Sequence, residues 1–410
     1  MNSYHRACAW IGFLLPALFA SEMAQALDLE SNLLGSARYR YETYDWADKG
    51  AIAGDRKSVA STLRLDLTGD FKVSNYAGFL LDFESVQQVG NDDYAVPFSK
   101  TQVKANAAPI ADPQGDNLNQ AYVKFMLPAQ TTVKIGTQEI ALNDGRFITN
   151  SAFRQHHQSF QAATISSAPL QNLRLDLGYL KRVYRVTGDD ATNGKADMHS
   201  KYFNAGYTVK GVGTFKAYGF LLDFDDEVTN STDTYGLRYE PMIPLSSSIN
   251  LIGLLEYAKQ KDSGDNPLKI NADYIAAEAG IAAGGISYKM GYKVLQGDGT
   301  NKFTTPLALP LNGWTELFLV TPNDGMKLWM LSVKGAVPGV KGLSFTTIYY
   351  DYKPDTDHGT NLGSEVDLGM EYKPSKQWLT GIRFAKYTAD GNSDRFQNAL
   401  RSSVYVTFNF

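Results

Sequence analysis

Hydrophobic and polar residues alternate along much of this 410-residue chain. The pattern is clear near the C-terminus, where Val404, Val406, Phe408 and Phe410 occupy every second position. Successive side chains of a β-strand point to opposite faces, so this alternation predicts strands with one apolar and one polar face. About 18 such segments begin near residues 33, 58, 76, 117, 130, 160, 172, 200, 214, 232, 247, 269, 285, 327, 342, 362, 377 and 400. The sequence therefore predicts an all-β fold.

The connections between the predicted strands alternate in length. Every second one is short, and the others are longer and polar, notably 90–116, 140–159, 187–199 and 297–326. Bacterial outer-membrane barrels have short periplasmic turns, long outer loops and an even number of strands. A soluble β-sandwich has no reason to alternate in this way. We therefore expect a transmembrane antiparallel β-barrel with about 18 strands, although 16 and 20 remain alternatives, and with both termini in the periplasm.

The N-terminal segment is typical of a secretory signal. His5 and Arg6 precede an apolar run at 7–20, and small residues follow at 24–26. The run is too short to span a bilayer as a helix. We expect a signal peptide over 1–26 and a single barrel domain over 27–410. The only cysteine, Cys8, falls in the signal peptide, so the mature chain would have no thiol or disulfide chemistry.

Composition agrees with a bacterial outer-membrane location. Aromatic residues make up 12% of the chain, yet mean hydropathy is only −0.27. A membrane barrel places aromatic side chains toward lipid and lines its lumen with polar ones, so its average hydropathy looks soluble. Phe408 and the terminal Phe410 resemble the signal read by the barrel-insertion machinery. The expected partners are therefore outer-membrane lipid, lipopolysaccharide and that machinery.

A barrel of this size has a lumen wide enough for water and solute unless loops fill it. If the apolar faces point to lipid, the inward residues include cations such as Lys134, Arg174 and Arg182, together with many carboxylates. The whole chain has a net charge of −4. Rings of one sign bias a pore toward one kind of ion. The inward residues as a set predict no strong overall bias.

The outer loop at 140–159 is unusually rich in apolar residues. It carries Leu142, Phe147, Ile148 and Phe153 within about 20 residues. A loop surrounded by water would not need these anchors. Folding inward against the barrel wall would bury them and would place Arg146 and Arg154 in the channel. For the loops at 90–116 and 297–326, a plug or gate and a compact outer cap are both open interpretations.

The region around this loop resembles the alginate export family of outer-membrane channels. The resemblance is carried by Gly136-x-Gln138, Asp144-Gly145-Arg146-Phe147-Ile148, Phe153-Arg154-Gln155 and Gln158-Ser159-Phe160-Gln161-Ala162. Phe153 and Gln161 stand where the family usually has tryptophan and aspartate. The resemblance implies an 18-stranded monomeric channel whose inward arginines, Arg146 and Arg154 here, guide an anionic polysaccharide. The candidate pore-lining residues are Arg146, Arg154, Lys134, Gln138, Asp144, Arg174 and Arg182.

We therefore expect a channel for a hydrophilic solute, an anionic poly- or oligosaccharide such as alginate, with a basic constriction. The alternative is a general-diffusion porin with little specificity. A hydrolase would need Ser159 with His156 or His157, but no supporting triad is evident. A non-conducting anchor or adhesion barrel is better suited to fewer strands. We expect no catalytic residue, cofactor, metal or nucleic-acid partner, and we expect solvation rather than calcium at the acidic run 223–227. The identity of the solute and the direction of transport stay open.

Overall fold

The computed structural model describes residues 30–48, 54–308, 312–356, 361–391 and 397–410. The predicted signal peptide at 1–26 lies outside the described residues. The described residues form an 18-stranded antiparallel sheet that closes on itself, because the first strand pairs with both the second and the last. The strands are β1 (Glu30–Asp48), β2 (Gly54–Lys72), β3 (Ala77–Asp93), β4 (Gly115–Leu127), β5 (Thr131–Gln138), β6 (Ser159–Leu170), β7 (Leu173–Tyr184), β8 (Lys195–Val209), β9 (Gly213–Leu222), β10 (Thr232–Pro244), β11 (Ile249–Asp262), β12 (Asn271–Ala283), β13 (Ile286–Leu295), β14 (Met326–Ala336), β15 (Leu343–Lys353), β16 (Gly363–Tyr372), β17 (Trp378–Ala389) and β18 (Ala399–Asn409).

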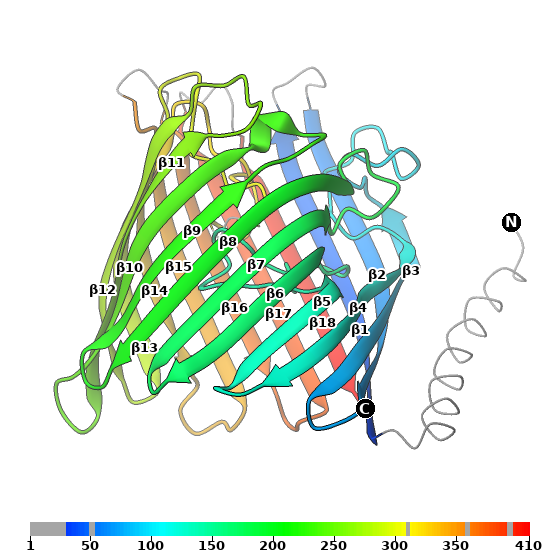
Figure 1. Ribbon diagram of the computed structural model, residues 1–410. Helices are drawn as coiled ribbons and strands as arrows, with labels where there is room; N and C mark the ends of the chain where they lie inside the picture. Colours follow the sequence, from blue (N-terminus) through cyan, green and yellow to red (C-terminus); the bar gives the residue numbers. More distant parts are fainter. Residues whose placement is uncertain (1–29, 49–53, 309–311, 357–360, 392–396) are drawn as a thin grey trace, which may run out of the picture.

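The predicted barrel with 18 strands is therefore confirmed (Figure 1). Closure pairs the backbone groups of both terminal strands, as the hydrocarbon region of a membrane requires. The pairing continues through the terminal residue, because the Phe410 N–H donates to the Gly35 carbonyl oxygen at 2.9 Å. None of the described residues forms a helix that is long and apolar enough to cross a membrane.

Alternation along the strands separates a lipid-facing surface from the lumen. Leu237 is 66% exposed on the outside of β10, whereas the next residue, Arg238, is buried inside. Leu331 and Ser332 show the same contrast on β14. Apolar side chains thus cover the outside, and the polar face of each strand is turned toward the lumen.

The two ends of the barrel differ as predicted. Short turns such as 128–130, 171–172 and 284–285 lie at one end, and the long connections lie at the other (Figure 1). One of the outer connections contains a single 3₁₀ turn, Val228–Asn230. The connection 139–158, which we call the constriction loop, folds into the barrel. So do residues 296–308 and 312–325 of the connection between β13 and β14, which we call the second loop.

The two inward loops are joined to one another. Ile148 and Leu307 form a parallel β-bridge. The backbone N–H of Thr149 and the side-chain amide of Gln158 both donate to the Leu307 carbonyl oxygen, at 3.3 and 2.8 Å. Figure 1 shows the segment after β5 crossing the interior of the barrel. The second loop therefore contributes to the filling of the lumen, which the sequence had left open.

Candidate functional site: the lumen around the constriction loop

One part of the constriction loop is held by aromatic packing. The Phe147 side chain is buried. Its ring centroid lies 5.2 Å from that of Tyr218 and 5.1 Å from that of Phe220, both on β9. Tyr274 of β12 and Phe303 of the second loop complete the cluster at 6.0 and 6.1 Å. Contacts at these separations stabilise beyond the apolar area they bury, so Phe147 ties the loop to the barrel wall.

The other part of the loop is held by buried ion pairs. Arg154 has no exposed surface, and its guanidinium faces Glu42 of β1 at 3.5 Å, Asp112 at 3.8 Å and Glu316 of the second loop. Arg401 of β18 shares two of these carboxylates, with Nη1 2.8 Å from Glu316 and Nε 2.6 Å from Glu42. Arg154 therefore connects the constriction loop, the second loop and the wall.

This placement differs from the expected pore-lining position of Arg154. Three carboxylates from different segments of the chain converge on it, and the sequence alone could not bring them together. Burial by itself raises the pKa of Glu316, but Arg154 and Arg401 outweigh burial and hold that pKa below its ordinary value. The carboxylate therefore stays ionised. Arg40 of β1 also pairs with Glu42 and lies 3.6 Å from Asp112, so three arginines face three carboxylates and the cluster is internally neutralised.

Asp144 and Arg146 stand at a tight turn in the middle of the loop. Gly145 between them adopts a φ of +78°, which glycine tolerates without cost. Asp144 lies 3.2 Å from Arg238 of the wall, and the Arg146 Nη1 donates to the Asn312 side-chain oxygen at 3.2 Å. Burial raises the pKa of Asp144, but Arg146 and Arg238 outweigh it and lower the pKa to about 2. Asp144 therefore holds a full negative charge between two cations.

A cavity of about 770 Å³ lies beneath this turn, on the side of the short turns. We call it the vestibule. Its titratable lining consists of six cations and three carboxylates: Arg146, Lys210, Arg238, Lys289, Lys293 and Lys334 against Asp144, Glu240 and Glu278. Glu278 pairs with both Lys289 and Lys293, at 3.4 and 3.3 Å. Lys334 is exposed in the lumen, and no carboxylate among the described residues pairs with it. The vestibule therefore has an excess of positive charge.

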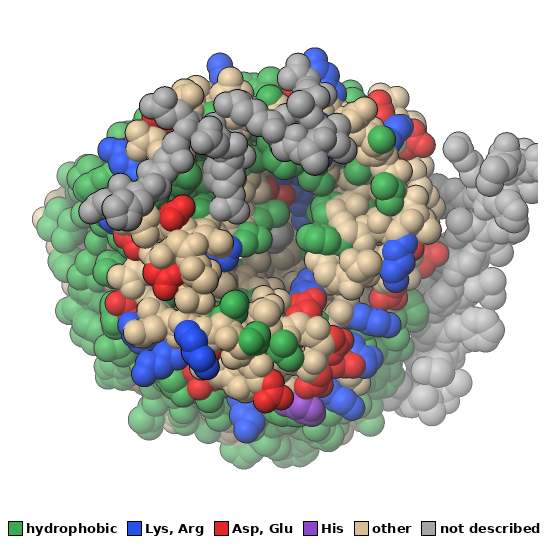
Figure 2. All heavy atoms as spheres, turned by 90° about the horizontal axis from the view of Figure 1, so that it is seen from above, with side chains coloured by type: hydrophobic (Ala, Val, Ile, Leu, Met, Phe, Trp, Pro, Cys, Tyr) green, Lys and Arg blue, Asp and Glu red, His purple; other side chains and the backbone are tan. Residues whose placement is uncertain are grey.

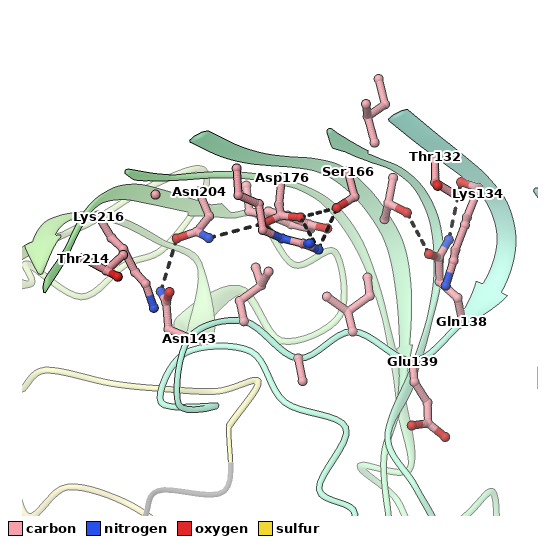
Figure 3. A pocket seen from close by; sticks show the side chains of 18 of the residues that line it. Thr132, Lys134, Gln138, Glu139, Asn143, Ser166, Asp176, Asn204, Thr214 and Lys216 are labelled. Atoms are coloured by element: carbon pink, nitrogen blue, oxygen red, sulfur yellow. Dashed lines mark hydrogen bonds and ion pairs between the residues drawn. The ribbon is translucent and has the colours of Figure 1, made fainter. Parts of the chain in front are cut away.

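A second cavity, of about 500 Å³, lies between the wall of β5–β9 and loop residues 139–143 (Figure 3). We call it the side chamber. Lys134, Gln138 and Arg174 line it, as do the side chains of Asn143 and Asn204. Thr208 and Thr214 line both cavities, so the side chamber adjoins the vestibule. Five of the predicted residues thus face two neighbouring cavities: Lys134, Gln138, Asp144, Arg146 and Arg174.

Arg182 does not join them. The pairing of β7 with β8 shifts register between Leu180 and Arg182, which reverses the face on which the following residues lie. As a result Val183 is fully buried, and Arg182 pairs with Asp197 on the outward face of β8, with Nη2 2.9 Å from Oδ2. Alternation predicted an inward Arg182 because a bulge cannot be seen in the pattern.

Six cations that line the two cavities are absent from the candidate pore-lining residues: Lys210, Lys216, Arg238, Lys289, Lys293 and Lys334. Lys216 lines the side chamber from β9, and Lys334 lines the vestibule from β14. Each continues the period-two pattern of its strand on the lumen side, next to Thr214 and Ser332. A consistent reading of that alternation through the strand ends would have found both.

Seen from the outer side, the loops narrow the barrel mouth to a central hollow (Figure 2). Its rim carries both Lys or Arg and Asp or Glu side chains. The outer mouth is therefore mixed in charge, whereas the vestibule on the other side of the constriction loop has more cations than carboxylates in its lining.

Residues 30–244 match the family profile described as alginate export. No curated protein sequence matches the chain. Similar solved structures include OccAB4 and OccAB3 of Acinetobacter baumannii, with 14% and 16% identity and TM-scores of 0.71 and 0.70. They align over 93% and 92% of this chain and 98% and 99% of theirs. OpdK of Pseudomonas aeruginosa, solved with vanillate, has 14% identity and a TM-score of 0.70 over 93% of this chain and 98% of its own. These neighbours are outer-membrane porins with the same type of barrel.

Proposed function

The chain belongs to the alginate export family of outer-membrane barrel channels, and on this premise we propose that it conducts an anionic saccharide through the vestibule. The observation that carries the proposal is the distribution of charge. The whole chain is net negative at −4, yet the vestibule lining has twice as many cations as carboxylates. Fixed charge of one sign on a pore wall favours ions of the opposite sign.

The constriction loop limits what can pass. Phe147 and Arg154 hold the loop against different parts of the barrel, so the turn at Asp144–Arg146 forms a fixed roof over the vestibule. A solute crossing the lumen has to pass beside this roof. A linear chain with one carboxylate per sugar residue suits such a path, because successive carboxylates can move from one lysine to the next.

A small carboxylate is the second candidate solute. The OpdK structure contains vanillate, which carries a single carboxylate on an aromatic ring. The same cations would attract it, so chain length and not charge separates the two candidates. A general-diffusion porin is the remaining outcome of the test.

The test is single-channel conductance and reversal potential of the full-length protein in a salt gradient, with and without oligoalginate or vanillate. The variant is Lys289→Gln with Lys334→Gln, and the matched control is Lys100→Gln with Lys269→Gln, which removes two charges from exposed outer positions. At about 4 Å in water one charge contributes about 1 kcal/mol, so the loss of two charges should lower the anion preference roughly 30-fold in the variant. Oligoalginate block should weaken in parallel and should be unchanged in the control.

Three results would contradict the proposal. Block by vanillate but not by oligoalginate would replace the saccharide with a small carboxylate. An unselective wild-type channel without block would make the protein a general porin. Equal effects of the variant and the control would mean that the vestibule cations do not set the selectivity.

A further inference from the structure

The side chamber differs from the vestibule in being built for hydrogen bonding. Its wall combines hydroxyl and amide side chains from neighbouring strands (Figure 3). Its volume of about 500 Å³ falls within the range of about 300–1,000 Å³ typical of small-molecule sites. In Figure 3, Lys134 and Gln138 lie at one end of the chamber, and Lys216 and Asn143 lie at the other.

Lys134 is the cation available for a ligand. Arg174 pairs with Asp176 at 3.2 Å, and Lys216 pairs with Glu240 at 2.8 Å. Among the described residues no carboxylate pairs with Lys134, whose Nζ lies 4.6 Å from the centre of the Tyr122 ring. A cation–π contact orients the ammonium but does not neutralise it. Lys134 can therefore bind an external carboxylate without breaking an ion pair.

The opposite end of the chamber offers an acceptor. The Asn143 amide group donates to the Asn204 side-chain oxygen at 3.3 Å, which fixes the Asn143 side chain. Its own oxygen is buried and has no hydrogen-bond partner among the described residues. A buried acceptor without a partner costs free energy that a ligand hydroxyl would recover.

An aromatic side chain also lines the chamber. Tyr202 lines the chamber from β8, and its ring lies close over Gly178 of β7. A Cβ atom at Gly178 would lie 2.1 Å from the Tyr202 Cε1 atom, so glycine is what allows the ring to lie against the wall.

We propose that the side chamber is a binding subsite for a short stretch of a carboxylated saccharide, in which Lys134 binds the carboxylate of one sugar residue and Asn143 accepts a hydroxyl of a neighbouring one. The subsite deepens the proposed function, on which it rests. A chain that passes through the vestibule would be held from the side, because the two cavities share Thr208 and Thr214.

The test measures binding of a mannuronate trisaccharide and of neutral maltotriose to the purified full-length barrel by calorimetry, together with the reversal potential. Lys134→Gln should weaken mannuronate binding about ten-fold, the loss expected for one charge-assisted hydrogen bond, and should leave the reversal potential near that of the wild type. Lys134→Arg should retain most of the affinity, and Lys269→Gln in an outer loop should retain all of it.

Asn143→Asp is a second variant, and it leaves the strands of the barrel wall unchanged because Asn143 lies in the constriction loop. It places a carboxylate in the chamber and should weaken mannuronate binding far more than any binding of maltotriose. Unchanged mannuronate affinity in both variants would overturn the subsite. The proposed function would still stand in that case if the wild-type channel is anion-selective and is blocked by oligoalginate. An unselective wild-type channel without block would instead overturn the proposed function. Equal losses for the charged and neutral sugars in Lys134→Gln would overturn the role of Lys134 as the carboxylate ligand.

Discussion

The arginine cluster around Arg154 and the vestibule around Lys334 are both rich in cations, but they use them differently. Arg154 is fully buried and shares Glu42 and Glu316 with Arg401. Lys334 is exposed in the lumen, and no carboxylate pairs with it in the described part of the chain. Charges removed from water are costly unless they are paired, whereas a hydrated charge can remain free.

The contrast shows that a basic residue inside a barrel is not by itself part of the solute path. Paired and dehydrated arginines hold the constriction loop, and hydrated lysines are left to act on what passes. Three changes test whether the buried groups hold the constriction loop in this way.

Arg154→Glu should have the largest effect. It replaces the central cation of the cluster with a fourth carboxylate beside Glu42, Asp112 and Glu316, at a cost of about 5 kcal/mol for unpaired buried charge. The constriction loop should leave the wall, which would raise the single-channel conductance and allow trypsin to cleave after Arg146. Lys269→Glu, the same change in charge at an outer loop, is the control. Conductance and cleavage equal to those of the wild type would show that Arg154 does not hold the loop.

Phe147→Ala should have an intermediate effect. The substitution removes a ring packed against four others and should cost about 3 kcal/mol of loop attachment. Because the ion pairs of Arg154 remain, we expect brief openings to a higher conductance and not a permanent one. Single-channel recordings measure this directly, and Phe98→Ala, at a residue that is 63% exposed, is the matched control. Recordings as quiet as those of the wild type would contradict an anchoring role for Phe147.

A change in pH should have the smallest effect over the neutral range. Glu139 accepts hydrogen bonds from His157 at 2.8 Å and Asn119 at 2.7 Å, which join the loop to β4. Burial raises the pKa of Glu139, but the hydrogen bond and charge of His157 outweigh it and lower the pKa to about 2. The pKa of Asp144 is also about 2, against ordinary values of 4.5 and 3.8 for Glu and Asp.

A carboxylate with a lowered pKa stabilises the fold fully above its ordinary pKa, and this contribution is lost as the pH falls through the folded-state value. As the pH falls, conductance noise should stay constant from about pH 6 to about pH 5 and should rise below about pH 4. On the alkaline side noise should also rise as His157 loses its proton, because burial lowers the pKa of His157 but the hydrogen bond to Glu139 outweighs burial and raises that pKa above its ordinary value. The measurement is open-channel noise across this series. Glu139→Gln should abolish part of the acid response, and a steady increase in noise beginning near neutral pH as the pH falls would argue against these two groups.

The strands were the part of the structure that the sequence predicted best. The segments predicted to begin near 269 and 342 carry apolar residues on both faces, yet they are present as β12 and β15, because their hydrogen bonds to neighbouring strands do not depend on a clear alternation. The inward fold of the loop at 140–159 was also predicted, from apolar residues such as Phe147 that a hydrated loop would not carry. The candidate pore residues were predicted less well, since a register shift turned Arg182 outward and burial removed Arg154 from the lumen.

The barrel, a count of about 18 strands and the two unlike ends follow from the sequence, because a period of two and the lengths of the connections are local properties of the chain. The structure selects 18 over 16 and 20. Only the tertiary structure decided which cations are paired. That outcome depends on Glu42, Asp112 and Glu316, which lie far apart in the sequence and meet only when the barrel closes and both loops fold inward. The sequence does not show which residue a charged side chain will pair with. Pairing and hydration together determine whether that side chain stabilises the structure or remains free to bind a solute.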